Sequence, residues 1–190
     1  MENRSEQYFC HETAIVDSGT IIEAGVKIWH FSHIMSGAVI GADSVLGQNV
    51  YVGSRSVIGK KCKIQNNVSL YDDVILQDDV FCGPSCVFTN VINPRAFVER
   101  KNEYLKTLVL RGASIGANAT IVCGVTLGQY SFIGAGSVVT GNIPDYSLVY
   151  GNPARQHGWV CRCGTKLDEH LLCSNCKSSY SKTDNGLILI

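Results

Sequence analysis

The stretch IMSGAVIGADSVLGQNVYVGSRSVIGKKCKIQNNVSL (residues 34–70) places an apolar residue at every sixth position. The same period runs from Val16 to Phe88, and a small or β-branched residue follows most of these positions four residues later. A helix would repeat its apolar residues every three or four positions, and a half-buried strand would repeat them every two. A sustained period of six instead predicts a hexapeptide β-helix, in which three short strands form one triangular coil of about eighteen residues.

Small and polar residues mark the corners of these coils. Segments such as IGADSV (40–45) and LGQNVY (46–51) place Gly, Asn and Asp between the apolar positions, where positive φ angles are useful. Successive coils would then stack as parallel strands about 4.8 Å apart, so each repeat stabilises its neighbours. The predicted fold class is therefore all-β, a parallel β-helix.

The repeat is interrupted once. It resumes at Val109 and continues through Val139, but Val109 lies 21 residues after Phe88 (109 − 88), which is not a multiple of six. Residues 89–108 should therefore leave the coil as an extruded loop. Loops of this length in compact domains are more often functional than accidental.

Composition excludes several classes of function. The chain has 190 residues, sixteen basic and sixteen acidic, and its basic residues are dispersed, so no nucleic-acid partner is expected. The first residues, MENRSEQYFC, lack the apolar run of a signal peptide, and no stretch approaches eighteen apolar residues. We therefore expect no membrane association and a cytoplasmic location.

The nine cysteines divide by position. Cys62, Cys82 and Cys86 occupy interior slots of the repeat, where cysteine acts as a small hydrophobe. No sequence pattern assigns a disulfide or metal partner to Cys10 or Cys123. The remaining four form two close pairs in a tail too short for a hydrophobic core, which predicts a structural zinc site; free thiols or a labile disulfide are the alternatives. These four are Cys161, Cys163, Cys173 and Cys176.

Two regions follow from these patterns. Residues 11–150 should form the β-helix, and residues 151–190 a Cys-rich tail that covers the end of the coil, where unpaired strand edges invite aggregation.

Six segments carry a family resemblance over roughly residues 11–160. They are IWHFSHI (28–34), LGQNVYVG (46–53), KIQNNVSLYDDV (63–74), FCGPSCVFTNVINPRAFVERKNEY (81–104), RGASIGANATIVCG (111–124) and GNPAR (151–155). In these the chain resembles the left-handed β-helix acyltransferases of the hexapeptide-repeat superfamily. Among these it is most similar to the bacterial enzymes that acetylate the 3-amino group of UDP-2-acetamido-3-amino-2,3-dideoxyglucuronate for surface polysaccharide such as O-antigen.

The resemblance implies a left-handed coil and a homotrimer, with acetyl-CoA as acetyl donor and active sites between neighbouring subunits. It also implies that Asn90 hydrogen-bonds and positions the sugar amine, with deprotonation by solvent or by the substrate itself. Asn90 acting only as a turn residue is the alternative. His33 is a second candidate, as a base, although it lies three coils, or roughly 15 Å, from Asn90. A neighbouring subunit could remove that separation.

An anionic acceptor needs cationic and polar contacts. Arg95, Arg100 and Lys101 are candidates for binding its carboxylate or phosphates, unless Glu99 and Glu103 pair with them as a solvated charge run. Other candidate contacts to the acceptor are His30, Gln65, Asn66, Asn67, Tyr71, Asp72, Asp73, Phe88 and Glu99, although corner preferences explain some of these equally well.

For acetyl-CoA, the resemblance places the pantetheine arm along the later coils. Backbone amides near Gly112, Gly124 and Ala135 would meet its amide groups, and Arg155 would meet its phosphates. The small residues also serve as ordinary β-helix corners.

Two other functions compete with the uronate acetyltransferase. One is an acetyltransferase for a different nucleotide-linked amino sugar, such as a dTDP-3-amino-3,6-dideoxyhexose. The other is a noncatalytic scaffold or a protein similar to γ-carbonic anhydrase. The latter needs three histidines that meet across a trimer interface. His11, His30, His33, His157 and His170 lack the expected spacing for it.

Overall fold

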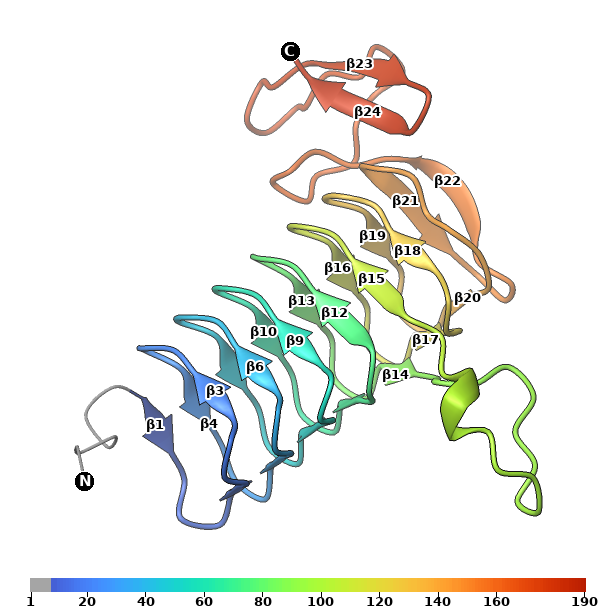
Figure 1. The fold of residues 1–190 in the computed structure, drawn as a ribbon. Coiled ribbons are helices and arrows are strands. Elements are labelled where there is room, and N and C mark those ends of the chain that lie inside the picture. The colour runs from blue at the N-terminus through green and yellow to red at the C-terminus, as the bar shows by residue number, and fades with distance from the viewer. Residues whose placement is uncertain (1–7) are drawn as a thin grey trace.

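Three sheets of short strands wrap into a triangular prism in the computed structural model, which describes residues 8–190 (Figure 1). We name each sheet by one of its strands. The β4 sheet contains β1 (Phe9–Cys10), β4 (Lys27–Ile28), β7 (Val45–Leu46), β10 (Lys63–Ile64), β13 (Phe81–Cys82), β16 (Ser114–Ile115), β19 (Phe132–Ile133), β21 (Ser147–Tyr150) and β22 (Arg155–Trp159). The β5 sheet contains β2 (Ile15–Val16), β5 (His33–Ile34), β8 (Tyr51–Val52), β11 (Ser69–Leu70), β14 (Val87–Phe88), β17 (Thr120–Ile121) and β20 (Val138–Val139). The β6 sheet contains β3 (Ile21–Ile22), β6 (Val39–Ile40), β9 (Val57–Ile58), β12 (Val74–Leu76), β15 (Thr107–Val109) and β18 (Thr126–Leu127).

The strands pair in parallel with a constant register. His33 pairs with Tyr51, for example, and Val39 pairs with Val57, so one coil advances the chain by eighteen residues. The step from Leu76 to Val109 is 33 residues (109 − 76), because the loop adds fifteen residues to that coil. The prediction of an all-β parallel β-helix built from hexapeptide repeats is confirmed.

The predicted apolar positions fill the interior of the prism. From Ile28 to Val139 they are at most 1 % exposed, and they pack into one continuous core. Cys62, Cys82 and Cys86 are buried among them, as predicted. Burial raises the pKa of Cys62 to about 11, so this thiol stays neutral at ordinary pH.

Corner residues adopt the left-handed backbone conformation in register from coil to coil. Asn49 and Asn67 have φ angles of 56° and 61°, and the Asn49 side chain donates a hydrogen bond to Asn67 Oδ1 at 3.1 Å. Asp43, Lys61 and Asp79 repeat this conformation at another corner. Asn and Asp tolerate positive φ better than most residues with a side chain, which explains their recurrence in the sequence.

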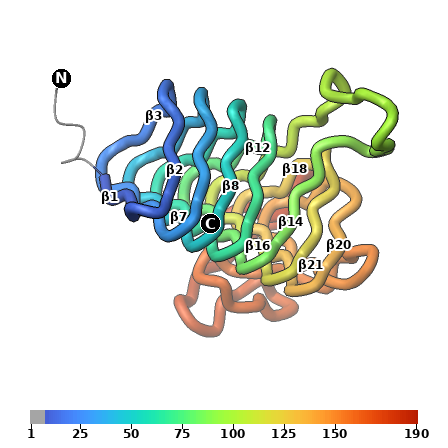
Figure 2. Tube along the Cα trace, turned by 90° about the horizontal axis from the view of Figure 1, so that it is seen from below, coloured from blue at the N-terminus to red at the C-terminus, as the bar shows by residue number. Residues whose placement is uncertain are grey.

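The extruded loop leaves the prism after β14 and returns at β15. It carries a short 3-10 helix, η2 (Lys101–Glu103), and projects away from the coils (Figures 1 and 2). The sequence predicted that the loop ends at residue 108, but β15 begins at Thr107, whose N–H donates to the carbonyl of Asp73. The segment outside the coils is therefore 89–106.

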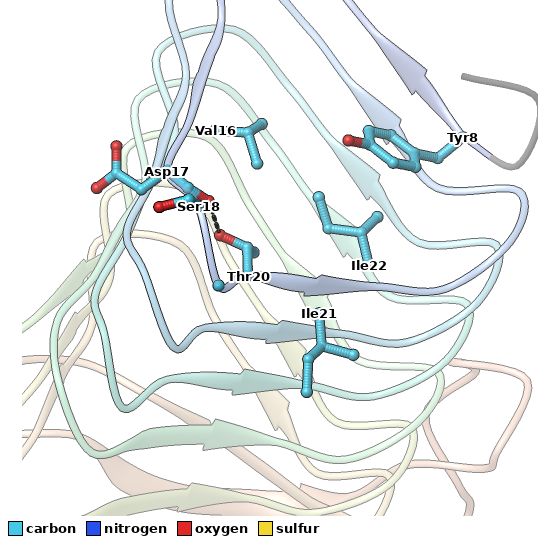
Figure 3. Close-up of a pocket in the computed structure, with 8 residues that line it drawn as sticks. Tyr8, Val16, Asp17, Ser18, Thr20, Ile21 and Ile22 are labelled. Carbon is cyan, nitrogen blue, oxygen red and sulfur yellow. Dashed lines mark hydrogen bonds between the residues drawn. The ribbon is translucent and has the colours of Figure 1, made fainter. Parts of the chain in front are cut away.

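The N-terminal end of the prism is hollow. β1 pairs with β4, so Cys10 occupies one more interior position before Val16 and the coils begin earlier than the predicted residue 11. A hollow of about 390 Å³ opens here, lined by Tyr8 and by residues 16–22. Figure 3 shows Val16 and Ile22 facing this hollow, so its apolar lining is the end of the core.

The C-terminal end differs from the predicted boundary. β21 and β22 form an antiparallel hairpin that extends the β4 sheet to Trp159, so the tail begins at residue 160 rather than 151. The tail contains the antiparallel pair β23 (Tyr180–Thr183) and β24 (Gly186–Leu189). Within residues 8–190, no helix has the length and apolar character needed to cross a membrane.

Replacing an interior anchor should destabilise the whole prism. We expect Ile64→Ala to lower the free energy of unfolding by about 2–5 kcal/mol, because it leaves a cavity between two neighbouring coils. Urea unfolding followed by circular dichroism measures this change. Lys63→Ala is the matched control on the same strand, since the Lys63 side chain points outward and its loss should cost less than about 0.5 kcal/mol. Equal effects of the two substitutions would contradict the assigned register.

Candidate functional site

The corner from which the loop leaves, between the β5 and β6 sheets, gathers several ionisable side chains. We call it the loop corner and define it as residues 17–20, 35–38, 53–56, 71–73, 89–106 and 122–125. His33 faces outward on β5 beside it, and its Nε2 lies 3.2 Å from Asp17 Oδ1. Both side chains are about one third exposed, at 39 % and 34 %. A carboxylate at this distance orients an imidazole, and an imidazole can accept a proton from a bound amine.

Tyrosines and a charged triad continue this surface along the next coils. The edge of the His33 ring faces Tyr51, whose ring centroid lies 5.9 Å from that of Tyr71. Burial, followed by the negative charge of Asp72, raises the pKa of Tyr51. Tyr51 therefore keeps its hydroxyl proton at neutral pH and can donate a hydrogen bond to a ligand.

Arg55 holds both neighbouring aspartates. Its guanidinium lies 3.1 Å from Asp72 and 2.8 Å from Asp73, and the hydrogen bond lowers the pKa of Asp73. Both aspartates were predicted to bind the acceptor sugar. Their carboxylates are instead already paired, because the corner itself uses them to join adjacent coils.

The loop encloses a hollow of about 320 Å³. Its lining includes Asn90, Arg95, Arg100 and Tyr104. The Asn90 carbonyl accepts a hydrogen bond from the Leu105 N–H at 3.0 Å, which closes the base of the loop. Within residues 8–190 the Asn90 side-chain amide has no hydrogen-bond partner, so it is free to meet a ligand.

The cations of the loop are paired with loop acceptors. Arg100 lies 2.8 Å from Glu103, and Lys101 lies 3.4 Å from Glu99. Arg95 donates to the carbonyl of Pro94 at 3.1 Å. These contacts agree with the alternative in which the loop cations pair with the glutamates of the loop. They weaken the prediction that Arg95, Arg100 and Lys101 bind a carboxylate of the acceptor.

A second hollow lies at the corner between the β4 and β5 sheets. It measures about 320 Å³ and is lined by residues that include Trp29, His30, Gln65 and Asn66. The His30 ring lies against that of His11, tilted by 31°, with 3.6 Å between centroids. Asn66 Oδ1 accepts the Gln48 N–H at 2.8 Å, so part of its hydrogen-bonding capacity joins coils rather than facing the hollow.

The predicted acceptor residues therefore do not meet in one pocket of one chain. The first hollow lies at the loop corner and the second at the opposite edge of the β5 sheet. The register His33, Tyr51, Ser69, Val87 separates β5 from the strand that leads into the loop by three strand spacings, or about 14 Å. The predicted separation of His33 and Asn90 is thus consistent with the register.

Two individual predictions are wrong. Phe88 is 1 % exposed because it is the inward anchor of β14, so it cannot contact a substrate. The Gly112 N–H already donates to the Asp78 carbonyl at 3.0 Å, and the Tyr130 ring lies where a Cβ on Gly112 would be, so this amide is not available to the pantetheine arm.

The residues of the predicted pantetheine track do not share one corner of a single chain. Gly112, Gly124 and Ala135 lie at three different corners, because their separations are not multiples of a coil. Gly124 is at the loop corner, where Leu105 packs against it, and Ala135 follows β19 at the opposite edge of the β5 sheet. Arg155 begins β22 near that edge and is exposed, with its guanidinium on the carbonyl of Ala154.

The sequence did not indicate three residues of the loop corner, Asp17, Arg55 and Tyr104, or Tyr51 beside it on β8. A coil repeat of eighteen residues could have paired Arg55 with Asp73. The contact between His33 and Asp17 crosses from a strand to the corner of the previous coil, a separation of sixteen residues that no repeat position indicates.

The four tail cysteines come together as predicted. Their sulfur atoms all lie within 4.8 Å of one another.

Comparisons with known families match the repeats. The model described as bacterial transferase hexapeptide (six repeats) matches residues 19–54 and 106–141, and the hexapeptide repeat of succinyl-transferase matches residues 37–72. The first model therefore matches coils that precede the extruded loop and coils that follow it.

One relative extends over nearly the whole chain. It is a dTDP-3-amino-3,6-dideoxy-α-D-galactopyranose 3-N-acetyltransferase from Aneurinibacillus thermoaerophilus, 50 % identical over 97 % of this chain and 96 % of its own length. A putative acetyltransferase from Staphylococcus aureus is 37 % identical over 44 % of this chain and 40 % of its own.

Solved structures support the fold. A putative acetyltransferase from Bacillus cereus superposes with a TM-score of 0.51 and 20 % identity, over 82 % of this chain and 83 % of its own. The acetyltransferase domain of PglB from Neisseria gonorrhoeae, solved with acetyl coenzyme A, gives 0.50 and 22 %, over 80 % and 58 %.

The bond between Arg55 and Asp73 should make stability depend on pH. Because the folded pKa of Asp73 is lowered, the pair stabilises the protein above the ordinary aspartate pKa and loses this effect as pH falls through the lowered value. We expect Arg55→Met to lower the melting temperature slightly at pH 7 and to match the parent in strong acid. Thermal melts across pH measure the difference between the two proteins. Lys60→Met is the control, since Lys60 forms no ion pair within residues 8–190, and a pH-independent Arg55→Met effect would contradict the assignment.

Proposed function

The chain belongs to the bacterial hexapeptide-repeat transferases, and from this we propose that it is an N-acetyltransferase that acts on a nucleotide-linked 3-amino sugar. The proposed donor is acetyl-CoA, and the proposed acceptor is a dTDP-3-amino-3,6-dideoxyhexose. The observation that carries this proposal is the 50 % identity, over nearly the full length of both chains, with an enzyme named for that acceptor. The product would be a 3-acetamido sugar nucleotide for surface polysaccharide such as lipopolysaccharide.

The proposed acceptor replaces the UDP-linked uronate that the sequence alone favoured. That preference relied on the resemblance of the sequence motifs, and it assigned Arg95, Arg100 and Lys101 as partners for a sugar carboxylate. Arg100 and Lys101 form ion pairs within the loop, and Arg95 donates to a backbone carbonyl. A 3,6-dideoxyhexose carries no carboxylate at C6, so these cations are not needed for a sugar carboxylate and remain candidates for the diphosphate.

Acetyl transfer needs a neutral amine, because a protonated amine has no lone pair with which to attack the thioester carbonyl. In the proposed mechanism the imidazole of His33, held by Asp17, accepts the amine proton as the C–N bond forms. The tetrahedral oxyanion then collapses, the C–S bond breaks, and the CoA thiolate leaves and takes up a proton. The unpaired amide of Asn90 would orient the acceptor amine toward the thioester.

His33 and Asn90 can share one substrate only if the substrate spans the three strand spacings or lies between two chains. We therefore propose a trimer in which the loop of one subunit faces the β5 sheet of its neighbour. The loop tip supports this arrangement, since Phe97 is 87 % exposed and Ile92 is 52 % exposed. Apolar side chains held so far from their own prism gain stability when a neighbouring subunit covers them.

The outward face of the β6 sheet supplies a second argument for association. Its outward column contains only aliphatic residues over five coils, which are Ile21, Val39, Val57, Ile75 and Leu108. The corresponding column of the β4 sheet is interrupted by Lys27 and Lys63. A continuous aliphatic column suits a subunit contact, and a heterologous contact of this kind closes into a ring of three.

The proposed location is the cytoplasm, where acetyl-CoA is available and thiols remain reduced. The nine cysteines are all free in the structure.

The proposed reaction is tested by release of the CoA thiol from acetyl-CoA in the presence of different acceptors. We expect turnover with a dTDP-3-amino-3,6-dideoxyhexose and none with UDP-2-acetamido-3-amino-glucuronate. Turnover restricted to the uronate would reverse the choice of acceptor, and no turnover with either would contradict the proposed activity.

Two substitutions separate the roles of the site residues. We expect His33→Asn to lower kcat about 10²-fold or more and to remove the acidic limb of the pH profile, the fall of kcat at low pH, because the proton acceptor is lost. Asn90→Ala should lower kcat/KM and leave the shape of that profile unchanged. His170→Asn is the control, because His170 also lies beside a carboxylate, Glu169, but is exposed in the tail. A His33→Asn profile that keeps its parent shape would exclude His33 as the base.

A charged residue introduced into the aliphatic column of the β6 sheet tests the proposed subunit contact. We expect Val57→Asp to shift the protein from trimer to monomer in sedimentation or light-scattering measurements, because the contact would bury an unpaired carboxylate. Val45→Asp provides the comparison, since Val45 is also an outward valine but lies on the β4 sheet. A trimer that survives Val57→Asp would place the contact on another face.

A further inference from the structure

We propose that Cys161, Cys163, Cys173 and Cys176 bind a structural zinc ion, and that this ion fastens the tail to the last coil of the prism. The proposal is independent of the acetyltransferase reaction, because the cysteines lie beyond β22, away from the loop corner.

The sulfur atoms already have the spacing of a tetrahedral thiolate site. Cys161 Sγ lies 3.3 Å from Cys176 Sγ, Cys163 Sγ lies 3.6 Å from Cys173 Sγ, and all four are within 4.8 Å of one another. Zinc–sulfur bonds of about 2.3 Å place the corners of a tetrahedron about 3.8 Å apart. A disulfide would need about 2.05 Å, so the cluster has the dimensions of a metal site and not of two cross-links.

Two tight turns present the cysteines. After the first pair, Gly164 has a φ of 88° and its N–H donates to the Cys161 carbonyl at 2.8 Å. After the second pair, Lys177 has a φ of 60° and its N–H donates to the Cys173 carbonyl at 3.0 Å. Each turn thereby directs both of its sulfur atoms toward the same point. The single residue between Cys161 and Cys163 is accommodated because Gly164 supplies the left-handed step.

Donors surround the sulfur atoms. The Cys176 N–H points at Cys173 Sγ over 3.5 Å, and the hydroxyl of Tyr180 lies 3.1 Å from Cys161 Sγ. Outer groups of this kind orient metal-bound thiolates and offset their negative charge. Tyr180 also accepts the Arg162 N–H at 3.0 Å, so its hydroxyl is held at the cluster.

The tail has little else to hold it together. Its only regular secondary structure is the β23–β24 pair, and its small buried cluster consists of Tyr146, Cys161, Leu167, Cys173, Tyr180 and Leu187. Two of these six are proposed ligands and one, Tyr146, belongs to the prism. So small an apolar core needs a metal or a cross-link to be stable.

The same cluster joins the metal site to the prism. The Tyr180 ring meets Tyr146 edge-on at 5.0 Å, and Tyr146 stacks on Tyr130 of the last full coil at 5.2 Å. The Asp145 N–H donates to the Asn185 carbonyl at 2.9 Å. A Cβ on Gly186 would overlap the Asp145 backbone, so the hairpin turn fits this contact closely. Metal binding thus supports a contact that covers the end of the coils.

The test measures metal directly on the full-length protein. Elemental analysis of protein purified without chelator should give one zinc per chain. Cobalt(II) introduced in its place should show the visible absorption and thiolate charge-transfer bands of a tetrahedral thiolate site. Cys176→Ser should abolish both signals, and Cys10→Ser, which removes an exposed cysteine outside the cluster, should leave both unchanged. Absence of metal, iron in place of zinc, or an intact mass short by four hydrogens would overturn the proposal.

Hydrogen exchange tests the link to the prism. A strong chelator should increase exchange of the Val160 and Asp145 amides, which bond to the Tyr146 and Asn185 carbonyls, and leave the amides of the middle coils protected. Gly186→Ala should produce the same local increase while zinc stays bound, because it breaks the docking contact and not the metal site. Unchanged exchange after zinc removal would show that the metal does not fasten the tail.

Discussion

A constant offset of eighteen residues between paired strands organises everything else in this molecule. Each inward residue stacks on the equivalent residue of the neighbouring coil, so the interior tolerates only small variations in size. The same offset places outward side chains in straight columns at strand spacing. A residue that contacts a ligand is therefore positioned by its coil number and its corner, and neither can change without displacing the core.

This constraint also explains how the polar residues are used. Each corner leaves backbone N–H groups that need acceptors, and side chains from the following coil supply them. Asn66 accepts the N–H of Gln48, and Asp78 accepts that of Lys60 at 2.8 Å. Polar residues at corners are consequently poor indicators of a binding site. His33 differs from them because it lies on the outward face of a strand and contacts Asp17 through its ring, and Asn90 differs because its side-chain amide has no hydrogen-bond partner within residues 8–190.

The extruded loop does not follow the eighteen-residue repeat, so its residues can form a site without changing the core. The extruded loop adds fifteen residues without disturbing the register on either side, since β12 and β15 pair as though the loop were absent. Two ion pairs form within the loop, Arg95 donates to a backbone carbonyl, and the apolar tip of the loop is exposed. A loop with these properties is suited to contact a neighbouring subunit, and the acceptor it helps to bind does not have to carry a carboxylate.

The sequence alone determined the architecture, the interior residues and the existence of the loop, because a period of six is imposed by the geometry of the prism and is readable without coordinates. It also identified the four tail cysteines. It could not show which polar residues join adjacent coils, as with Asp72 and Asp73, since corner residues and ligand contacts are drawn from the same amino-acid types. The pairing of His33 with Asp17 and the boundary of the tail after Trp159 emerged only from the folded chain. They depend on contacts between residues whose separations match neither six nor eighteen, so only the three-dimensional arrangement decides them.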